Sequence, residues 1–110
     1  MVEDQVLDRT YQALADPTRR RLIETLREGD ARITDLAEPL PMTFAGVSRH
    51  IGVLESAGLV QREKRGREQW VSLRPDGLAH AQEWINDQTD FWSARADALA
   101  ARLRRKGQAR

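Results

Sequence analysis

The sequence predicts a mostly α-helical fold with one small β-hairpin, an α+β arrangement. Apolar residues recur at helical spacing along most of the chain, capping residues divide this pattern into separate helices, and strand-like runs occur only on either side of residue 66. The 110 residues, of which 40% are hydrophobic and 32% charged, have the size of one ordinary domain. We therefore expect a single domain over residues 1–110.

A proline marks the junction of the first two predicted helices. Between residues 6 and 14 apolar side chains recur at steps of mostly three or four, which predicts an amphipathic helix over about 3–15. Asp16 can then accept hydrogen bonds from free backbone amides as an N-cap, and Pro17 suits the first helical turn because it has no amide hydrogen. A second helix is therefore expected to begin here and to end at Gly29.

Two short helices are predicted next, over about residues 34–57. Thr34 is the candidate N-cap of the first, which two prolines confine to about two turns. Thr43 is the candidate N-cap of the second, which Gly58 ends. Four apolar residues of this second helix recur at steps of three, four and three and should face inward: Phe44, Val47, Ile51 and Leu54. Two helices joined by a turn of a few residues form a helix-turn-helix.

A two-stranded hairpin is predicted over about residues 59–73. Two short runs flank Arg65-Gly66, where glycine permits the positive φ that a hairpin tip often requires. A hairpin in this place is the wing of a winged helix-turn-helix fold. The helical period returns at Asp76 and predicts a final helix over about 76–105, roughly 40 Å long at about 1.5 Å per residue.

The final helix carries a longer apolar stripe than a domain of this size can cover. A partner chain is the economical cover, and the first helix is its natural companion in the interface. The residues predicted at this homodimer interface are Val6, Leu78, Ile85, Trp92, Leu99 and Leu103. Two alternatives stay open: Trp84, Phe91 and Trp92 could pack against their own domain, or they could line a small-molecule pocket at the interface.

The helix that begins at Thr43 has an outer face that suits a nucleic-acid groove. At about 100° per residue, the side opposite its apolar stripe comprises Ala45, Gly46, Arg49, Gly52 and Val53, flanked by Ser48 and His50. Small residues permit close approach, and an arginine can bind guanine or phosphate. The hairpin adds a basic cluster where a wing would meet DNA, formed by Arg62, Lys64, Arg65 and Arg67. Double-stranded DNA is therefore the predicted partner; the alternative is a solvent-exposed helix followed by a basic turn.

The sequence argues against several other classes of protein. It has no cysteine, which excludes disulfides, thiolate metal sites and a cysteine nucleophile. It has no glycine-rich phosphate loop, no set of serine, histidine and acid, and no metal cluster, so we expect no enzyme. No apolar stretch approaches the roughly 20 residues of a membrane span, and the acidic start is unlike a secretory signal. We expect a cytoplasmic protein with no membrane partner.

Three stretches and the wing resemble the ArsR-type winged-helix regulators. The stretches are residues 14–23 (LADPTRRRLI), 33–37 (ITDLA) and 47–60 (VSRHIGVLESAGLV), and the basic hairpin at Gly66 follows. The resemblance spans roughly residues 5–100. It implies a homodimer held by the first and last helices, which places the helix at Thr43 in a major groove of a palindromic operator. Half-sites would then lie about 34 Å apart. Binding by such regulators usually represses transcription until an inducer releases the DNA.

The resemblance also assigns roles to individual residues. By matching positions, it implies DNA contacts from Ser48, Arg49 and His50, with Thr43 and Ala45 near the bases and Arg65 and Arg67 in the wing. Metal-responsive members of the family use cysteines, or carboxylates and histidines on the last helix, where this chain offers only His80. We therefore predict no metal and no cofactor, and the identity of any small-molecule inducer stays open. The main alternative is a winged-helix interaction or dimerisation module without specific DNA binding, which would carry acidic or apolar residues at positions 49, 65 and 67.

Overall fold

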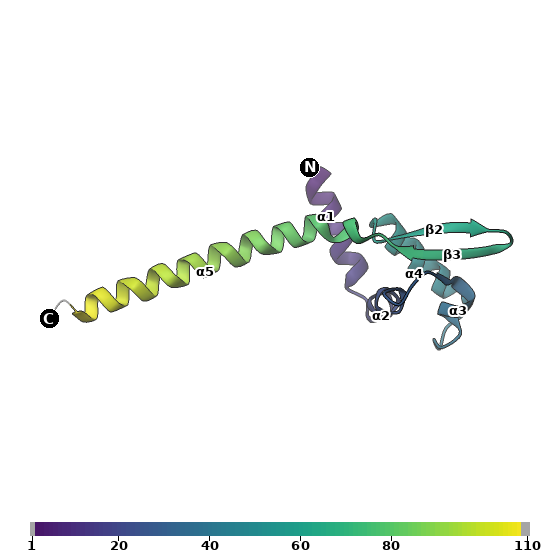
Figure 1. The fold of residues 1–110 in the computed structure, drawn as a ribbon, viewed down its shortest axis with the longest axis horizontal. Helices are drawn as coiled ribbons and strands as arrows, with labels where there is room; N and C mark the ends of the chain where they lie inside the picture. The colour runs from purple at the N-terminus through teal and green to yellow at the C-terminus, as the bar shows by residue number, and fades with distance from the viewer. Residues whose placement is uncertain (1, 109–110) are drawn as a thin grey trace. The chain divides into compact units, whose positions relative to one another are not determined.

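The structure is a computed structural model that describes the backbone of residues 2–108 and the side chains of residues 4–107. Its elements are, in chain order, α1 (Val2–Leu14), α2 (Pro17–Leu26), β1 (Ala31–Arg32), α3 (Ile33–Ala37), α4 (Phe44–Ser56), β2 (Val60–Arg65), β3 (Glu68–Leu73), a 3-10 turn (Pro75–Leu78) and α5 (Ala79–Gln108) (Figure 1). The chain divides after His80 into two units, of which the second contains α5 from Ala81 onward. The mostly helical fold with a hairpin is confirmed. A single domain over residues 1–110 stays a prediction.

The junction between α1 and α2 follows the predicted capping chemistry. The Asp16 carboxylate accepts hydrogen bonds from the backbone N–H groups of Thr18 at 2.8 Å and Arg19 at 3.2 Å, and Pro17 is the first residue of α2. These amides have no partner within the helix, so the carboxylate satisfies two of them. The predicted N-cap is confirmed.

Two arginines of α2 bind the end of α1 in return. Arg19 donates from Nε to the Ala13 carbonyl at 2.7 Å and from Nη2 to the Gln12 carbonyl at 2.8 Å. Arg20 donates from Nη1 to the Leu14 carbonyl at 2.7 Å. The last carbonyls of a helix lack helical partners and carry partial negative charge, so cationic donors suit them. These bonds fix the angle between α1 and α2.

The cap of α2 gives a pH-dependent prediction. Hydrogen bonds from the Arg19 and Thr18 amides lower the pKa of Asp16, against the opposing effect of desolvation. A carboxyl whose pKa falls on folding contributes stability above its unfolded pKa and loses it as the pH drops through the folded value. Asp16→Ala should therefore lower the urea midpoint at pH 7. Asp16→Asn keeps a hydrogen-bond acceptor that does not titrate. Its urea midpoint should lie below that of wild type at pH 7, and the difference between the two midpoints should shrink at pH 3. A gap that is unchanged with pH would contradict this assignment.

The helix-turn-helix is confirmed as α3 and α4. The Thr43 hydroxyl accepts a hydrogen bond from the Gly46 amide at 3.0 Å, as expected of the N-cap of α4. Gly58 ends the helix with φ of +75°, and the Leu59 amide donates back to the Leu54 carbonyl at 3.0 Å. This is the Schellman arrangement, in which glycine takes the left-handed position without steric cost.

Two details of the helix-turn-helix prediction are wrong. Thr34 is not the N-cap of α3, because β1 leads directly into the helix and Arg32 occupies the cap position. Phe44 does not join the inward stripe, since 50% of its surface is exposed, while Val47, Ile51 and Leu54 are fully buried. Phe44 is the first residue of α4 and borders a small hollow of about 170 Å³ beside the tip of the hairpin.

The hairpin is the larger part of a three-stranded antiparallel sheet with the order β1-β3-β2. β2 and β3 pair from Val60↔Leu73 to Arg65↔Glu68, so the turn has two residues and begins at Gly66, whose φ is +64°. A positive-φ glycine at the first turn position is the arrangement of type II′ hairpins. β1 was not predicted: the sequence indicated two strands, and Ala31 and Arg32 add a short third strand on β3.

One core holds the first unit together. Its buried residues come from every helix of this unit and from the sheet: Ala13, Leu22, Leu26, Ile33, Leu36, Val47, Ile51, Leu54, Leu59, Val60 and Val71. The inward stripe of α4 belongs to this core and holds the helix in place. The opposite face of α4 therefore points away from the core.

α5 leaves its apolar residues exposed. Between residues 82 and 107 every side chain is exposed except those of Gln88 and Ala101, which are half-buried. The exposed large apolar residues of α5 are Trp84, Ile85, Phe91, Trp92, Leu99 and Leu103, and Trp92 is the most exposed at 63%. A single helix cannot bury its own apolar stripe. Of the other predicted interface residues, Val6 is half-buried on α1 and Leu78 is exposed in the 3-10 turn.

Candidate nucleic-acid interface

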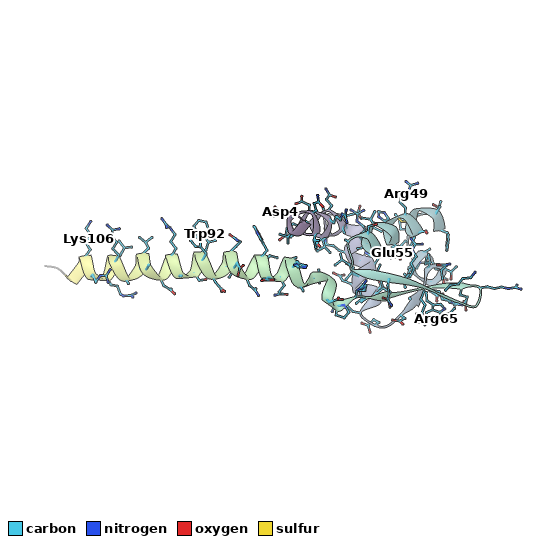
Figure 2. The ribbon with its side chains drawn as sticks, turned by 90° about the horizontal axis from the view of Figure 1, so that it is seen from above. Asp4, Arg49, Glu55, Arg65, Trp92 and Lys106 are labelled. Atoms are coloured by element: carbon cyan, nitrogen blue, oxygen red, sulfur yellow. The ribbon has the colours of Figure 1, made fainter. Side chains whose placement is uncertain are left out.

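The outer face of α4 borders a groove of about 650 Å³ in the first unit. Ala45, Arg49 and Val53 are exposed along this face, and Gly52 lies half-buried between them. Figure 2 shows Arg49 extending away from the body of the unit. No hydrogen bond or ion pair joins Arg49 to another residue described by the structure, so its guanidinium has all its donors available for a ligand.

Arg62 ties β2 to α4. Its guanidinium donates to the Ser48 hydroxyl at 3.0 Å and to the Ser48 carbonyl at 2.7 Å, and its Nε lies 3.5 Å from a Glu55 carboxylate oxygen. That Nε is buried without a hydrogen-bond partner. The guanidinium passes close to Gly52, where a β-carbon would be in van der Waals contact with Arg62 Nη2 at 3.4 Å. Arg62 and Ser48, both predicted to contact DNA, are thus bound to each other.

His50 lies on the side of α4 that faces α2. Arg19 Nη1 lies 3.2 Å from His50 Nδ1, and because arginine can only donate, Nδ1 must accept with the ring proton on Nε2. His50 is half-buried. Thr43 and Gly46 bind each other through the helix cap, and Thr43 is exposed at the start of α4. Five of the residues predicted to contact DNA therefore lie in α4 and the sixth, Thr43, is its N-cap, but His50 is oriented toward α2.

The wing separates its basic residues into two kinds. Arg65 donates to Asp30 and Glu63, each at 3.0 Å, and lies over the Trp70 ring at 4.8 Å from its centre. The hydrogen bonds with Asp30 and Glu63 raise the pKa of Arg65. Lys64 and Arg67 are exposed and form no ion pair with any side chain in the described part of the chain. With Arg62, which is paired with Glu55, the wing thus presents two uncompensated and two compensated cations.

Two residues of α1 at the groove were missed by sequence analysis. Arg9 and Gln12 line the groove together with the outer face of α4. They are three positions apart, so they share one side of α1, but nothing in the sequence indicates which helix lies beside that side.

Two other kinds of site concern residues 2–108, the range that the structure describes. No group of three or more histidine, aspartate or glutamate side chains in this range is arranged to hold a metal ion. None of the helices in the same range has the length and apolar character to cross a membrane.

Comparison with known proteins gives the family. Residues 16–62 match the model of the bacterial regulatory protein, arsR family. HTH-type transcriptional regulator Rv2034 of Mycobacterium tuberculosis is 40% identical over 86 residues, which cover 78% of either chain. Transcriptional repressor SdpR of Bacillus subtilis is 27% identical over 79 residues, which cover 72% of this chain and 88% of that protein.

Solved structures agree in fold. The crystal structure of the ArsR family transcriptional regulator RHA00566 superposes with a TM-score of 0.78 at 31% identity, covering 82% of this chain and 93% of that one. The homodimeric winged helix-turn-helix DNA-binding domain of Mb0332 from Mycobacterium bovis superposes with a TM-score of 0.64 at 22% identity, covering 78% and 80%. With its helix-turn-helix, its wing and these relatives, the chain belongs to the ArsR family of bacterial transcriptional regulators.

Proposed function

We propose that this protein represses transcription by binding a palindromic operator as a homodimer, with α4 of each protomer in a major groove. The observation that carries this proposal is the outer face of α4, where Arg49 extends without a partner among the described residues and small side chains surround it. An arginine in this setting can form a bidentate pair with guanine. We propose repression and not activation of transcription because the Bacillus subtilis relative is named a transcriptional repressor.

The wing supplies contacts to the DNA backbone. Lys64 and Arg67 are the exposed cations without ion pairs, so they bind phosphate. Arg65 can exchange Asp30 and Glu63 for phosphate oxygens, at the cost of two existing bonds. Arg62 instead holds the wing on α4 through Ser48 and thereby fixes the distance between the two DNA-contacting elements. Ser48 contributes to the same surface through its bond with Arg62, whereas His50, which is oriented toward α2, would have to leave Arg19 to reach DNA.

The exposed apolar stripe of α5, with Val6 on α1 and Leu78, supplies the dimer interface. Aromatic and aliphatic side chains as exposed as Trp92 and Leu103 are typical of surfaces that a partner covers. The Mycobacterium bovis structure is described as homodimeric. Two-fold symmetry then sets the two α4 helices about 34 Å apart, one turn of DNA. A small-molecule inducer, with the α5 aromatic residues as one place for it, stays a prediction of the family resemblance.

Replacing Arg49 tests the reading of bases. Arg49→Ala should weaken binding to the operator by roughly 1 to 3 kcal/mol and leave binding to random DNA nearly unchanged. Arg67→Ala is the matched variant, because it removes one exposed arginine from the wing. It should weaken binding to the operator and to random DNA to the same degree and reduce the salt dependence of binding. Affinities from fluorescence anisotropy on both duplexes give this comparison. Equal losses on both duplexes for Arg49→Ala would refute its role as a base reader.

The proposed function as a whole is tested by the unmodified protein. Its affinity for the DNA upstream of its own gene is compared with that for a random duplex of equal length, at two salt concentrations. Selective binding that weakens with salt is the expected result. Absence of binding at low salt would favour the alternative, a protein-interaction module.

A further inference from the structure

α1 and α4 form the two sides of the groove beside the DNA-reading face. α1 supplies Arg9 and Gln12, β2 supplies Arg62, and α4 with its C-cap residue supplies the remaining lining residues, among them Arg49. Figure 2 shows Asp4 of α1 and Arg49 of α4 toward the same edge of the first unit. A surface that meets DNA through the outer face of α4 therefore continues onto α1.

The groove is positively charged. Three arginines line it and no aspartate or glutamate does, although the chain as a whole has 18 basic and 17 acidic residues. Arg62 is occupied by Ser48 and Glu55. Arg9 is exposed and forms no ion pair or hydrogen bond with any residue that the structure describes. Asp76 lines a neighbouring hollow that Arg9 also borders, but its carboxylate lies 3.8 Å from Arg74. An exposed cation that shares a groove with Arg49 and has no ion pair of its own among the described residues is an attractive position for a phosphate.

We propose that Arg9 and Gln12 of α1 form a second DNA contact, which binds the sugar-phosphate backbone between the two half-sites. The inference rests on the proposed function. It follows from the groove, which joins these residues to Arg49, and from Val6, one helical turn before Arg9 and assigned to the dimer interface. Arg9 then lies closer to the two-fold axis than Arg49 does. Contacts that flank the reading helix position a protein on DNA without reading sequence.

The test is a salt titration of DNA binding. Each neutralised phosphate contributes about 0.9 to the slope of log affinity against log salt, and a dimer carries two copies, so Arg9→Ala should reduce the slope by roughly 1.8 on operator and random DNA alike. Arg9→Lys should keep the slope. Gln12→Ala should weaken affinity at unchanged slope, because it removes a neutral hydrogen-bonding group.

The matched control is Arg21→Ala, which removes an exposed arginine of α2 that does not line the groove. It should leave the slope at the wild-type value. A wild-type slope for Arg9→Ala would overturn the inference, and so would a loss of thermal stability without a change of slope, since this would assign Arg9 to internal packing.

The two proposals can fail separately. If wild type does not prefer its operator to random DNA, the proposed function fails whatever Arg9 does. If wild type is selective and Arg9→Ala behaves like Arg21→Ala, only the contact from α1 is wrong.

Discussion

Gly77→Ala is expected to lower the free energy of unfolding by about 3 kcal/mol, at the upper end of what overpacking costs. A β-carbon at position 77 would lie 2.1 Å from the Gly58 carbonyl oxygen and 3.0 Å from the Leu59 α-carbon. Both are backbone atoms that hold the C-terminal cap of α4, so no side-chain rotation can relieve the clash. Either the 3-10 turn moves off α4 or the cap opens.

Thermal or urea unfolding at equal protein concentration measures this effect, since the proposed dimerisation would make the midpoint depend on concentration. Gly107→Ala is the control, because a β-carbon there meets no atom within 4 Å and alanine favours the helix. The unfolding midpoint of Gly107→Ala should equal or exceed that of wild type. If Gly77→Ala and Gly107→Ala unfold at the same midpoint, the close packing of Gly77 against Gly58 does not contribute to stability.

Trp92→Glu is expected to convert the dimer to monomers at micromolar concentration. Loss of a central aromatic residue from an interface costs about 2 kcal/mol or more, and a two-fold interface loses it twice. The combined cost of about 4 kcal/mol corresponds to roughly a 1,000-fold weaker dimer. Analytical ultracentrifugation over a range of concentrations measures this change. Operator affinity should fall with it, since one protomer reads only one half-site.

Asn86→Glu is the control for this substitution. It adds the same charge on the polar side of α5, where the residues three and four positions away are Gln82, Glu83, Thr89 and Asp90. The variant should remain dimeric. If Trp92→Glu also remains dimeric with unchanged affinity, the stripe of α5 is not the interface.

The capped helices could be predicted because their signals are local. The Asp16 and Thr43 caps join residues two or three apart, and Gly58 and Gly66 act on their own backbone dihedrals. The buried stripe of α4 followed from helical periodicity except at Phe44, where the helix begins and the core no longer covers it.

Features that depend on contacts between distant residues could not be predicted in this way. β1 has only two residues, and it is a strand only because β3 pairs with it. The basic residues of the hairpin read as one cluster in sequence, yet Arg62 bonds to Ser48 on α4 and Arg65 to Asp30 before β1. The groove contribution of Arg9 depends on α1 lying beside α4. The sequence thus predicted which residues are basic but not which of them are already paired.

The sheet is assembled from parts at very different distances along the chain, and this sets an order of folding. β2 and β3 meet across a two-residue turn, which closes a short loop at small entropic cost. β1 reaches β3 only when a loop of some 40 residues closes, and the Arg32–Glu68 and Arg65–Asp30 pairs that accompany it join residues 36 and 35 positions apart. We therefore expect the hairpin to form early and to act as a template. β1 is expected to join it late, after α3 and α4 have packed onto the core, and to be the first strand released when the domain opens.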